Sequence, residues 1–323
     1  MSPDVIIQTS DLTKSYGDIR AVDHISFEVH KGEIFGFLGP NGAGKTSTIR
    51  MLTGLSQPTN GKASILGFDV SSEIVEVKRH IGVVPEISNL YDELSAFENL
   101  LFMAQLYGIP RRERKNRIEE LLKTFGLYDR KDSTFRSFSR GMKRALTIAA
   151  ALIHNPAILF LDEPTVGLDI MAARSLRNLI GNLRQQGMTV FLTTHYLEEA
   201  DLLCDRVAIL VKGKIIKIDT PKSLKSAAEE ESLIEFTFGN GISDLVGELS
   251  QRLAGVEVIK IDNQKVKIYG GIASDVYENV FRFALNHGIK IQTINSIKPS
   301  LEDAFMKITG LSPIVMAIEK GGK

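Results

Sequence analysis

Short apolar segments alternate along the first two thirds of the chain with segments whose apolar residues recur at helical spacing. The apolar segments predict buried strands, because a strand that is covered on both faces carries no row of polar positions. They lie at residues 33–38, 157–161, 190–194 and 207–211, and residues 5–38 as a whole favour short strands joined by turns. Strands that alternate with helices predict an α/β fold with a largely parallel sheet, covered on both faces.

Helical patterns dominate residues 89–155. Ser95 and Glu98 form a capping box before an apolar run, which predicts the start of a helix. Residues 114–125 carry apolar positions at i, i+3, i+4 and i+7, and residues 176–183 show a second stripe of this kind. We therefore expect a helical subdomain at about 89–155 and a further amphipathic helix after the strand at 157–161.

The pattern changes after Ala227–Glu231, a stretch of small and acidic residues that we interpret as a linker. Beyond it we expect a strand at 233–238, a helix at 243–254, strands at 256–262 and 265–270, a helix at 274–287, a strand at 289–297 and a short helix at about 300–309. The order β-α-β-β-α-β is that of a ferredoxin-like α+β domain. Two domains follow, at residues 1–228 and 229–323.

Composition narrows the class of protein. The chain has 323 residues and a formal net charge of zero, whereas a dedicated nucleic-acid binder usually presents a basic surface. Cys204 is the only cysteine, which excludes an internal disulfide and suits a reducing compartment. No secretory signal is expected at the N-terminus, and no apolar stretch reaches the 18 or so residues of a transmembrane helix. A role at a membrane would therefore depend on a partner.

The strongest motif is a phosphate-binding P-loop, G-x-x-x-x-G-K-[ST], between the strand at 33–38 and a helix. Its residues are Gly39, Pro40, Asn41, Gly42, Ala43, Gly44, Lys45 and Thr46, followed by Ser47. Glycines let successive backbone N–H groups point at phosphate oxygens. Lys45 supplies a positive charge for the β- and γ-phosphates, and Thr46 supplies a hydroxyl ligand for Mg²⁺. The motif predicts a bound nucleoside triphosphate.

A second motif follows the strand at 157–161, where the chain continues into two carboxylates. Asp162 matches a Walker B aspartate, which helps to hold Mg²⁺. Glu163 is the candidate general base or water-orienting group. Adjacent side chains on a strand point apart, which gives the two acids separate roles.

A third motif, Ser139-Arg140-Gly141-Met142, precedes the helix that extends toward His154. Ser139 is a good N-cap, and the free N–H groups of a helix start form a second anion site. One chain that binds one nucleotide does not need two such sites, whereas two chains that face each other do.

Together these motifs make the first 225 residues or so resemble the ATP-binding subunit of an ABC transporter. Gly39–Thr46 match Walker A, Ser139–Met142 the signature, Ile158–Glu163 Walker B, Val166–Asp169 the D-loop and His195 the switch histidine. Tyr16 matches the aromatic residue that stacks on adenine, with Val22 beside the ribose.

The resemblance implies an ATPase that uses ATP and Mg²⁺ and that dimerises head to tail with a second copy or a paralogous subunit. The signature residues Ser139, Arg140, Gly141 and Met142 would contact the nucleotide held by the other chain. Asp169 would lie at the dimer interface, and His195 would contact the γ-phosphate. Taken alone, His195 would fit a structural histidine better than a functional one. The pair of subunits would power a separate membrane permease from the cytoplasmic face of the cell membrane.

Two departures from the family pattern stand out. Glu86 replaces the usual glutamine after the strand at 81–85; it could still ligate Mg²⁺, but it adds negative charge beside the phosphates. Arg140 and Met142 replace a glycine and a glutamine of the signature, a variant similar to ABC-2 type export subunits such as daunorubicin-resistance ATPases. The segment from Lys298 to Phe305 resembles the tail domain of that subgroup.

Other functions stay open from the sequence. A soluble ABC protein that acts on ribosomes or nucleic acid is one alternative, although a single P-loop and the lack of long heptads argue against it. A slow-turnover regulatory ATP-binding module is another. The basic run Arg111–Arg117 fits a solvated helix face, or docking to a permease or to anionic lipid. Nucleic acid is not expected there, because the run has no aromatic residues for base stacking.

Overall fold

The computed structural model describes residues 4–229, 233–239, 241–253, 255–296 and 300–311, which form two compact units. The first unit extends to Pro221, and the second comprises Lys222–Leu311. Within the described ranges, no helix combines the length and apolar character needed to cross a bilayer.

A six-stranded sheet in the order β10-β9-β3-β8-β7-β6 forms the centre of the first unit. Its strands are β3 (Ile34–Leu38), β6 (Ile81–Val84), β7 (Ile158–Asp162), β8 (Thr189–Thr194), β9 (Arg206–Val211) and β10 (Lys214–Asp219). All neighbouring pairs are parallel except β9 and β10. The predicted parallel sheet is thus confirmed. Every residue of β3, β7 and β8 is buried, which explains why these strands are visible as apolar runs.

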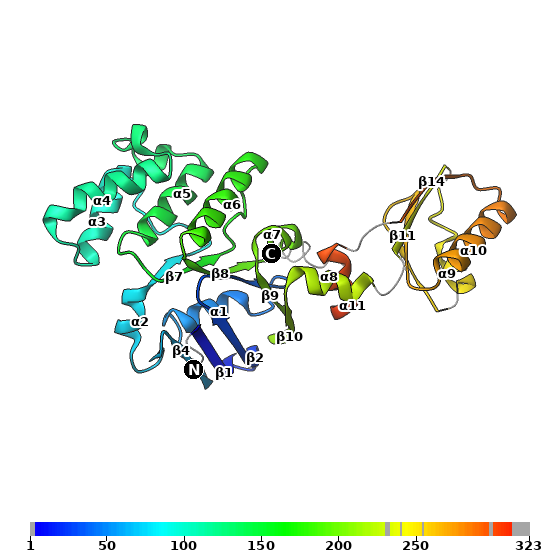
Figure 1. The fold of residues 1–323 in the computed structure, drawn as a ribbon, viewed down its shortest axis with the longest axis horizontal. Coiled ribbons are helices and arrows are strands. Elements are labelled where there is room, and N and C mark those ends of the chain that lie inside the picture. The colour runs from blue at the N-terminus through cyan, green and yellow to red at the C-terminus, as the bar shows by residue number, and fades with distance from the viewer. Residues whose placement is uncertain (1–3, 230–232, 240, 254, 297–299, 312–323) are drawn as a thin grey trace. The chain divides into compact units, whose positions relative to one another are not determined.

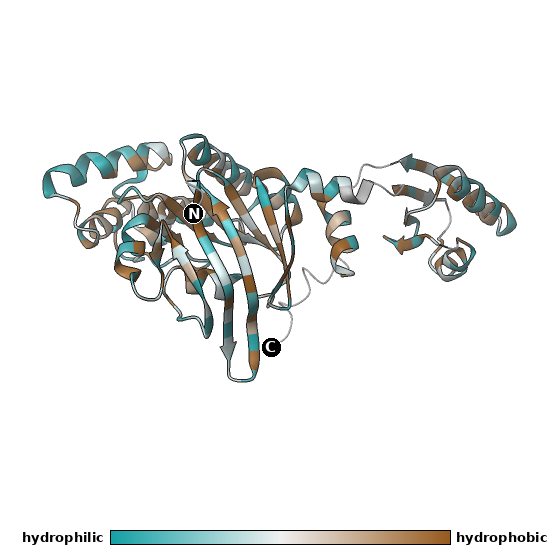
Figure 2. Ribbon diagram, turned by 60° about the horizontal axis from the view of Figure 1, so that its bottom comes forward, coloured by the Kyte–Doolittle hydropathy of each residue, from teal (hydrophilic) through white to brown (hydrophobic). Residues whose placement is uncertain are grey.

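An antiparallel sheet in the order β2-β1-β4-β5 packs against one part of this core. It comprises β1 (Val5–Tyr16), β2 (Ile19–His30), β4 (Asn60–Ile65) and β5 (Phe68–Asp69). Along β2, hydrophobic buried residues alternate with hydrophilic exposed ones from Ile25 to Val29, and Figure 2 shows both kinds of residue on the two long strands. The inward residue Phe27 lies against Phe35 and Phe37 of β3, with ring centroids 5.7 and 5.0 Å apart. This packing fixes the strand that leads into the P-loop.

Helices complete the first unit. They are α1 (Lys45–Leu52), α2 (Ile74–His80), α3 (Ala96–Leu106), α4 (Arg111–Thr124), the 3₁₀ turns η1 (Tyr128–Arg130) and η2 (Phe135–Ser137), α5 (Arg140–Ala151), α6 (Ile170–Gln185) and α7 (Leu197–Leu203). Figure 1 shows α3, α4 and α5 grouped together, as predicted for residues 89–155. The capping box is confirmed, since Ser95 Oγ accepts from Glu98 N and Glu98 Oε2 accepts from Ser95 N. Most residues of the basic run on α4 are exposed.

The second unit has the predicted order of strands and helices. Its elements are α8 (Pro221–Glu229), β11 (Leu233–Phe238), α9 (Val246–Arg252), β12 (Glu257–Lys260), β13 (Lys265–Tyr269), α10 (Ala273–Asn286), β14 (Ile291–Ser296) and α11 (Leu301–Thr309). The four strands form an antiparallel sheet in the order β12-β13-β11-β14. Phe236 and Phe238 of β11 pack with Val280 and Phe283 of α10 in a separate core.

The interpretation of Ala227–Glu231 as a linker was wrong for its first part, because α8 continues to Glu229. Alanine and glutamate are good helix formers, and this preference outweighs the linker-like composition. The remaining linker residues, like Lys298 and Pro299 of the tail segment, lie outside the described residues. The second compact unit begins at Lys222 and so includes most of α8, whereas the sequence predicted a boundary after residue 228 and no helix directly before it.

Candidate nucleotide-binding site

The P-loop joins the end of β3 to the start of α1. Gly42 and Gly44 adopt φ values of 78° and 106°, a region that residues other than glycine rarely adopt. A Cβ on Gly39 would lie 2.2 Å from the carbonyl oxygen of Leu210. No side chain caps the N-terminus of α1. The loop therefore needs its glycines, and it leaves the helix N–H groups for an anion.

A pocket of about 300 Å³ lies over this loop. It is lined by Tyr16, Ala21, Asn41, Gly42, Ala43, Gly44, Lys45, Thr46, Ser47, Glu86, Glu163 and His195. The chain thus brings together, from distant parts of the sequence, most of the residues that the P-loop, Walker B and switch motifs predict. Gly39 and Pro40 contribute differently, since their carbonyl oxygens accept hydrogen bonds from Lys45 Nζ at 2.6 and 3.1 Å.

The prediction for Val22 needs a correction. Its side chain is fully buried in the core, and the neighbouring Ala21 lines the pocket instead. Successive side chains of a strand point to opposite faces, so β2 can present only one of these two residues to the pocket.

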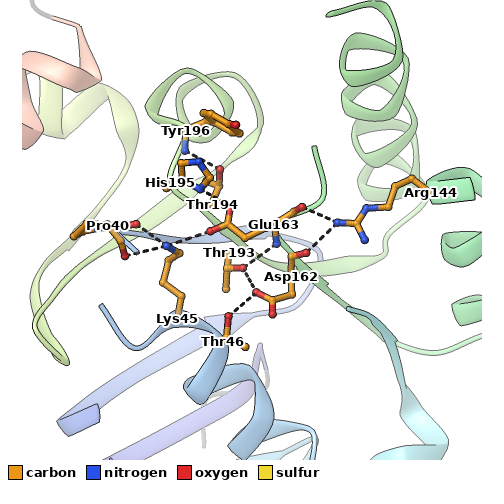
Figure 3. A network of polar contacts seen from close by, with 11 residues as sticks. Pro40, Lys45, Thr46, Arg144, Asp162, Glu163, Thr193, Thr194, His195 and Tyr196 are labelled. Atoms are coloured by element: carbon orange, nitrogen blue, oxygen red, sulfur yellow. Dashed lines mark hydrogen bonds and ion pairs between the residues drawn. The ribbon is translucent and has the colours of Figure 1, made fainter. Parts of the chain in front are cut away.

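Lys45 and Glu163 form a buried ion pair at the centre of the site (Figure 3). Nζ of Lys45 lies 3.1 Å from Oε1 of Glu163, and the side chains are only 5% and 8% exposed. His195 Nδ1 lies 2.9 Å from Oε2, so each carboxylate oxygen has a partner. Burial raises the pKa of Glu163, but the hydrogen bond with His195 and the charge of Lys45 oppose this and lower it below its ordinary value. Glu163 is therefore ionised at neutral pH.

The backbone of Glu163 is unusual, with a φ of +47°. A glutamate in the left-handed region costs free energy, which the surrounding contacts must offset. Its N–H group donates to Oγ1 of Thr193, at 3.0 Å. Glu163 thus sits at the sharp turn that directly follows β7.

Asp162 faces different partners. Its Oδ1 accepts hydrogen bonds from Thr193 Oγ1 at 2.6 Å and from Thr46 Oγ1 at 3.3 Å. Burial raises the pKa of Asp162, while these hydrogen bonds lower it, and the net direction is upward. A cation beside Asp162 would oppose this rise.

The Thr46 hydroxyl and the Asp162 carboxylate fit Mg²⁺, which prefers oxygen ligands. Among the described residues there is no cluster of three or more acidic, histidine or cysteine side chains that could hold a metal alone. Mg²⁺ commonly takes one or two protein ligands together with phosphate oxygens and water. Glu86, exposed at the pocket rim, is close enough to raise the pKa of Asp162 by its charge.

The signature residues lie outside this pocket. Ser139 is the N-cap of α5, and its Oγ accepts from Met142 N at 3.3 Å. Gly141 packs closely on α6, since a Cβ there would lie 2.9 Å from Cβ of Ala172. Arg140 Nη1 donates to the carbonyl oxygen of Gly167, and Asp169, exposed, caps α6. The single chain does not join the signature to its own P-loop.

Two contributors escaped the sequence analysis. Thr193 belongs to a strand predicted only as apolar core, although its hydroxyl contacts both Asp162 and the N–H of Glu163. Arg144, on α5, is 7% exposed and donates to carbonyl oxygens beside both carboxylates. A charged residue among the apolar positions of α5 was the available signal for Arg144.

Comparisons with known proteins agree with this geometry. The family model described as ABC transporter matches residues 22–166. The linearmycin resistance ATP-binding protein LnrL of Bacillus subtilis (strain 168) is 37% identical over 307 residues, covering 94% of this chain and 98% of that protein. The bacitracin transport ATP-binding protein BcrA of Bacillus licheniformis is also 37% identical, covering 94% and 97%. The ATP-binding cassette MJ0796, solved as a post-hydrolysis dimer bound to ADP and Pi, has a TM-score of 0.61 and 28% identity, covering 67% of this chain and 98% of that one.

Proposed function

The chain belongs to the ATP-binding subunits of ABC transporters of the export type, and from this membership we propose that it closes as a dimer around two ATP molecules and powers export through a separate permease. The observation that carries the proposal is the separation of the P-loop pocket from the signature within one chain. Each nucleotide would lie between the P-loop of one subunit and Ser139, Arg140, Gly141 and Met142 of another.

The surface beside the signature supports a shared site. Ile170 and Met171 follow Asp169 on α6 and are 83% and 68% exposed. Large apolar side chains at such exposure favour burial against another molecule. The relative MJ0796 was solved as a dimer bound to ADP and Pi. The partner subunit here would be a second copy or a paralogue.

The residues in the pocket can carry out ATP hydrolysis. Glu163 would accept a proton from water as the water oxygen bonds to the γ-phosphorus and the bond to the β,γ-bridging oxygen breaks. Lys45 would leave Glu163 to bind the β- and γ-phosphates, and His195 would bind the γ-phosphate. Thr46, Asp162 and Glu86 would hold Mg²⁺, which offsets charge on the phosphates when bound. Tyr16, 46% exposed at the pocket rim, would stack on the adenine.

The relatives' descriptions, linearmycin resistance and bacitracin transport, support export of a small molecule. We place the subunit at the cytoplasmic face of the membrane, held there by the permease. No nucleic acid is needed as a partner.

We also assign a ferredoxin-like arrangement to the second unit and propose that it supports dimerisation or regulation. The order β-α-β-β-α-β and the sheet order β12-β13-β11-β14 support the assignment. Removal of this unit would then change dimerisation, ATPase activity or transport.

Complementation between two inactive variants tests the shared site. Lys45→Met inactivates the P-loop, and Ser139→Arg inactivates the signature. Each variant alone should be inactive, because each homodimer has a defect in both of its sites. In an equal mixture about half of the dimers are mixed and each has one intact site, so activity should return to about a quarter of the wild-type value for independent sites and to less than that for coupled ones. A mixture that forms mixed dimers and stays inactive would contradict the shared site.

A further inference from the structure

Arg144 extends from α5 into the space between the two loops that carry the acidic residues of the site. Its guanidinium has five N–H donors, and five backbone carbonyl oxygens accept from them. Nε donates to Pro164 (2.8 Å), Nη1 to Pro85 and to Glu86 (3.4 Å), and Nη2 to Asp162 (3.0 Å) and Glu163 (2.6 Å). Figure 3 shows the contacts with the last two. One side chain therefore ties three segments of the chain together.

The hydrogen bonds from Arg144 restrain the backbone that positions the Glu163 and Glu86 carboxylates. Glu163 occupies a disfavoured φ of +47°, and its carbonyl oxygen accepts one of the shorter bonds from Arg144. The carbonyl of Glu86 accepts from the same guanidinium, so the rim of the pocket and the turn after β7 share an anchor. Charged hydrogen bonds to several acceptors fix direction as well as distance.

The anchor also links these loops to the signature. Arg144 lies about one turn inside α5, whose N-cap is Ser139. A helix turn is stiff, so a shift of the N-terminus of α5 would move the guanidinium and the carbonyls attached to it. Lysine could reach some of these oxygens but lacks the planar fork.

We propose that Arg144 is a positioning residue that couples the signature of each subunit to the catalytic carboxylate of that same subunit. This inference rests on the proposed function, because the signature of one chain would contact the nucleotide of the other. When the nucleotide of the partner subunit contacts the N-terminus of α5, Arg144 would shift the backbone of Glu163 in the same chain as that α5. Arg144 would thereby make hydrolysis at the two sites cooperative.

Steady-state ATPase assays and titrations of a non-hydrolysable ATP analogue on the full chain test the coupling. For Arg144→Gln we expect kcat to fall about 10- to 100-fold, since small errors in position cost rate, while the dissociation constant changes less than about threefold. The Hill coefficient should fall to about 1, and Arg144→Lys should recover part of kcat. Arg184→Gln is the control for removal of a hydrogen-bonded arginine, because Arg184 makes two hydrogen bonds, both to Asp205, and neither touches the pocket.

The outcomes separate this inference from the proposed function. A wild-type protein with hyperbolic kinetics and no ATP-dependent dimer would refute the shared-site function itself. A cooperative wild type with Arg144 variants that keep its kcat and Hill coefficient would refute the coupling alone. The Arg144 variants could instead lose kcat, affinity and melting temperature in parallel, and by no more than Arg184→Gln does. That result would show that Arg144 has only a structural role. If Arg144→Gln does not fold, Arg144→Lys decides, and wild-type kcat and cooperativity in that variant overturn the proposal.

Discussion

Glu163→Gln should strengthen nucleotide binding while it strongly slows hydrolysis. In the structure Lys45 Nζ contacts Glu163 Oε1 at 3.1 Å, and both side chains are almost fully buried. The phosphates of ATP require the same ammonium group. Nucleotide binding therefore competes with the ion pair, and a neutral acceptor at residue 163 should compete less.

The magnitude follows from the kind of hydrogen bond that is lost. Glu163→Gln turns an ion pair into a hydrogen bond between one charged and one neutral group, and hydrogen bonds to charged groups span about 1.5–3 kcal/mol. We therefore expect the contact that competes with ATP to weaken by about 1–1.5 kcal/mol, the width of that range. ATP should then bind about five- to tenfold more tightly. Loss of a general base should lower kcat by about 10²- to 10⁴-fold. The variant should accumulate as an ATP-bound dimer.

Isothermal titration with a non-hydrolysable ATP analogue measures the affinity without interference from turnover. Light scattering with Mg-ATP then measures the dimer. Glu33→Gln is the control, because it neutralises another buried carboxylate, one that pairs with Arg206 at 3.1 Å and does not line the pocket. Its affinity for the analogue should equal that of the wild type.

Weaker binding of the analogue to Glu163→Gln would refute the competition between Lys45 and the phosphates. A variant that keeps wild-type turnover would refute the role of Glu163 as base. A strictly monomeric variant in saturating Mg-ATP would count against the dimer that closes around two ATP molecules.

Two further predictions concern charge. Glu86→Gln should tighten ATP binding about two- to fivefold, the range of an exposed charge interaction, and the gain should shrink at high salt; a gain that salt leaves unchanged would contradict an electrostatic origin. Asp303→Asn should destabilise the second unit by about 1.5–3 kcal/mol, because Tyr269 and Ser300 donate to this buried carboxylate. Burial raises the pKa of Asp303, but these hydrogen bonds lower it below its ordinary 3.8. The unfolded chain therefore binds the proton first, and the stabilisation, complete above about pH 3.8, is lost as the pH falls through the folded value. Thermal unfolding across pH should show the wild type converging on Asp303→Asn in acid, and a constant difference would refute this assignment.

Much of the fold was predictable because local rules govern it. The strands β3, β7 and β8 are buried on both faces, which makes their sequences uniformly apolar. The P-loop encodes its own backbone, since glycines at residues 42 and 44 take positive φ and the helix follows directly. Lys45 and Thr46 could therefore be assigned from their place in one short motif.

Contacts between distant segments were less predictable. Ala21 rather than Val22 lines the pocket because the two residues lie on opposite faces of β2. Which face of β2 is turned to the pocket depends on its pairing with β1, and the sequence of one strand does not show that pairing. The carbonyl oxygens that surround Arg144 come from residues 18 to 59 positions away. Backbone groups have no sequence signature, so an arginine that binds them cannot be recognised from its neighbours.

The role of the signature residues could not be predicted from the fold of one chain, because it depends on how subunits assemble. Ser139 and Asp169 are exposed and cap the helices α5 and α6, so their local roles are complete within one chain. The start of α5 nevertheless presents the positive end of a helix dipole, which favours an anion. The anion bound over this chain's own P-loop would occupy a pocket that the signature does not line. At the proposed shared site a phosphate at α5 would come from another subunit, which is why the order of the motifs leads us to propose a partner chain.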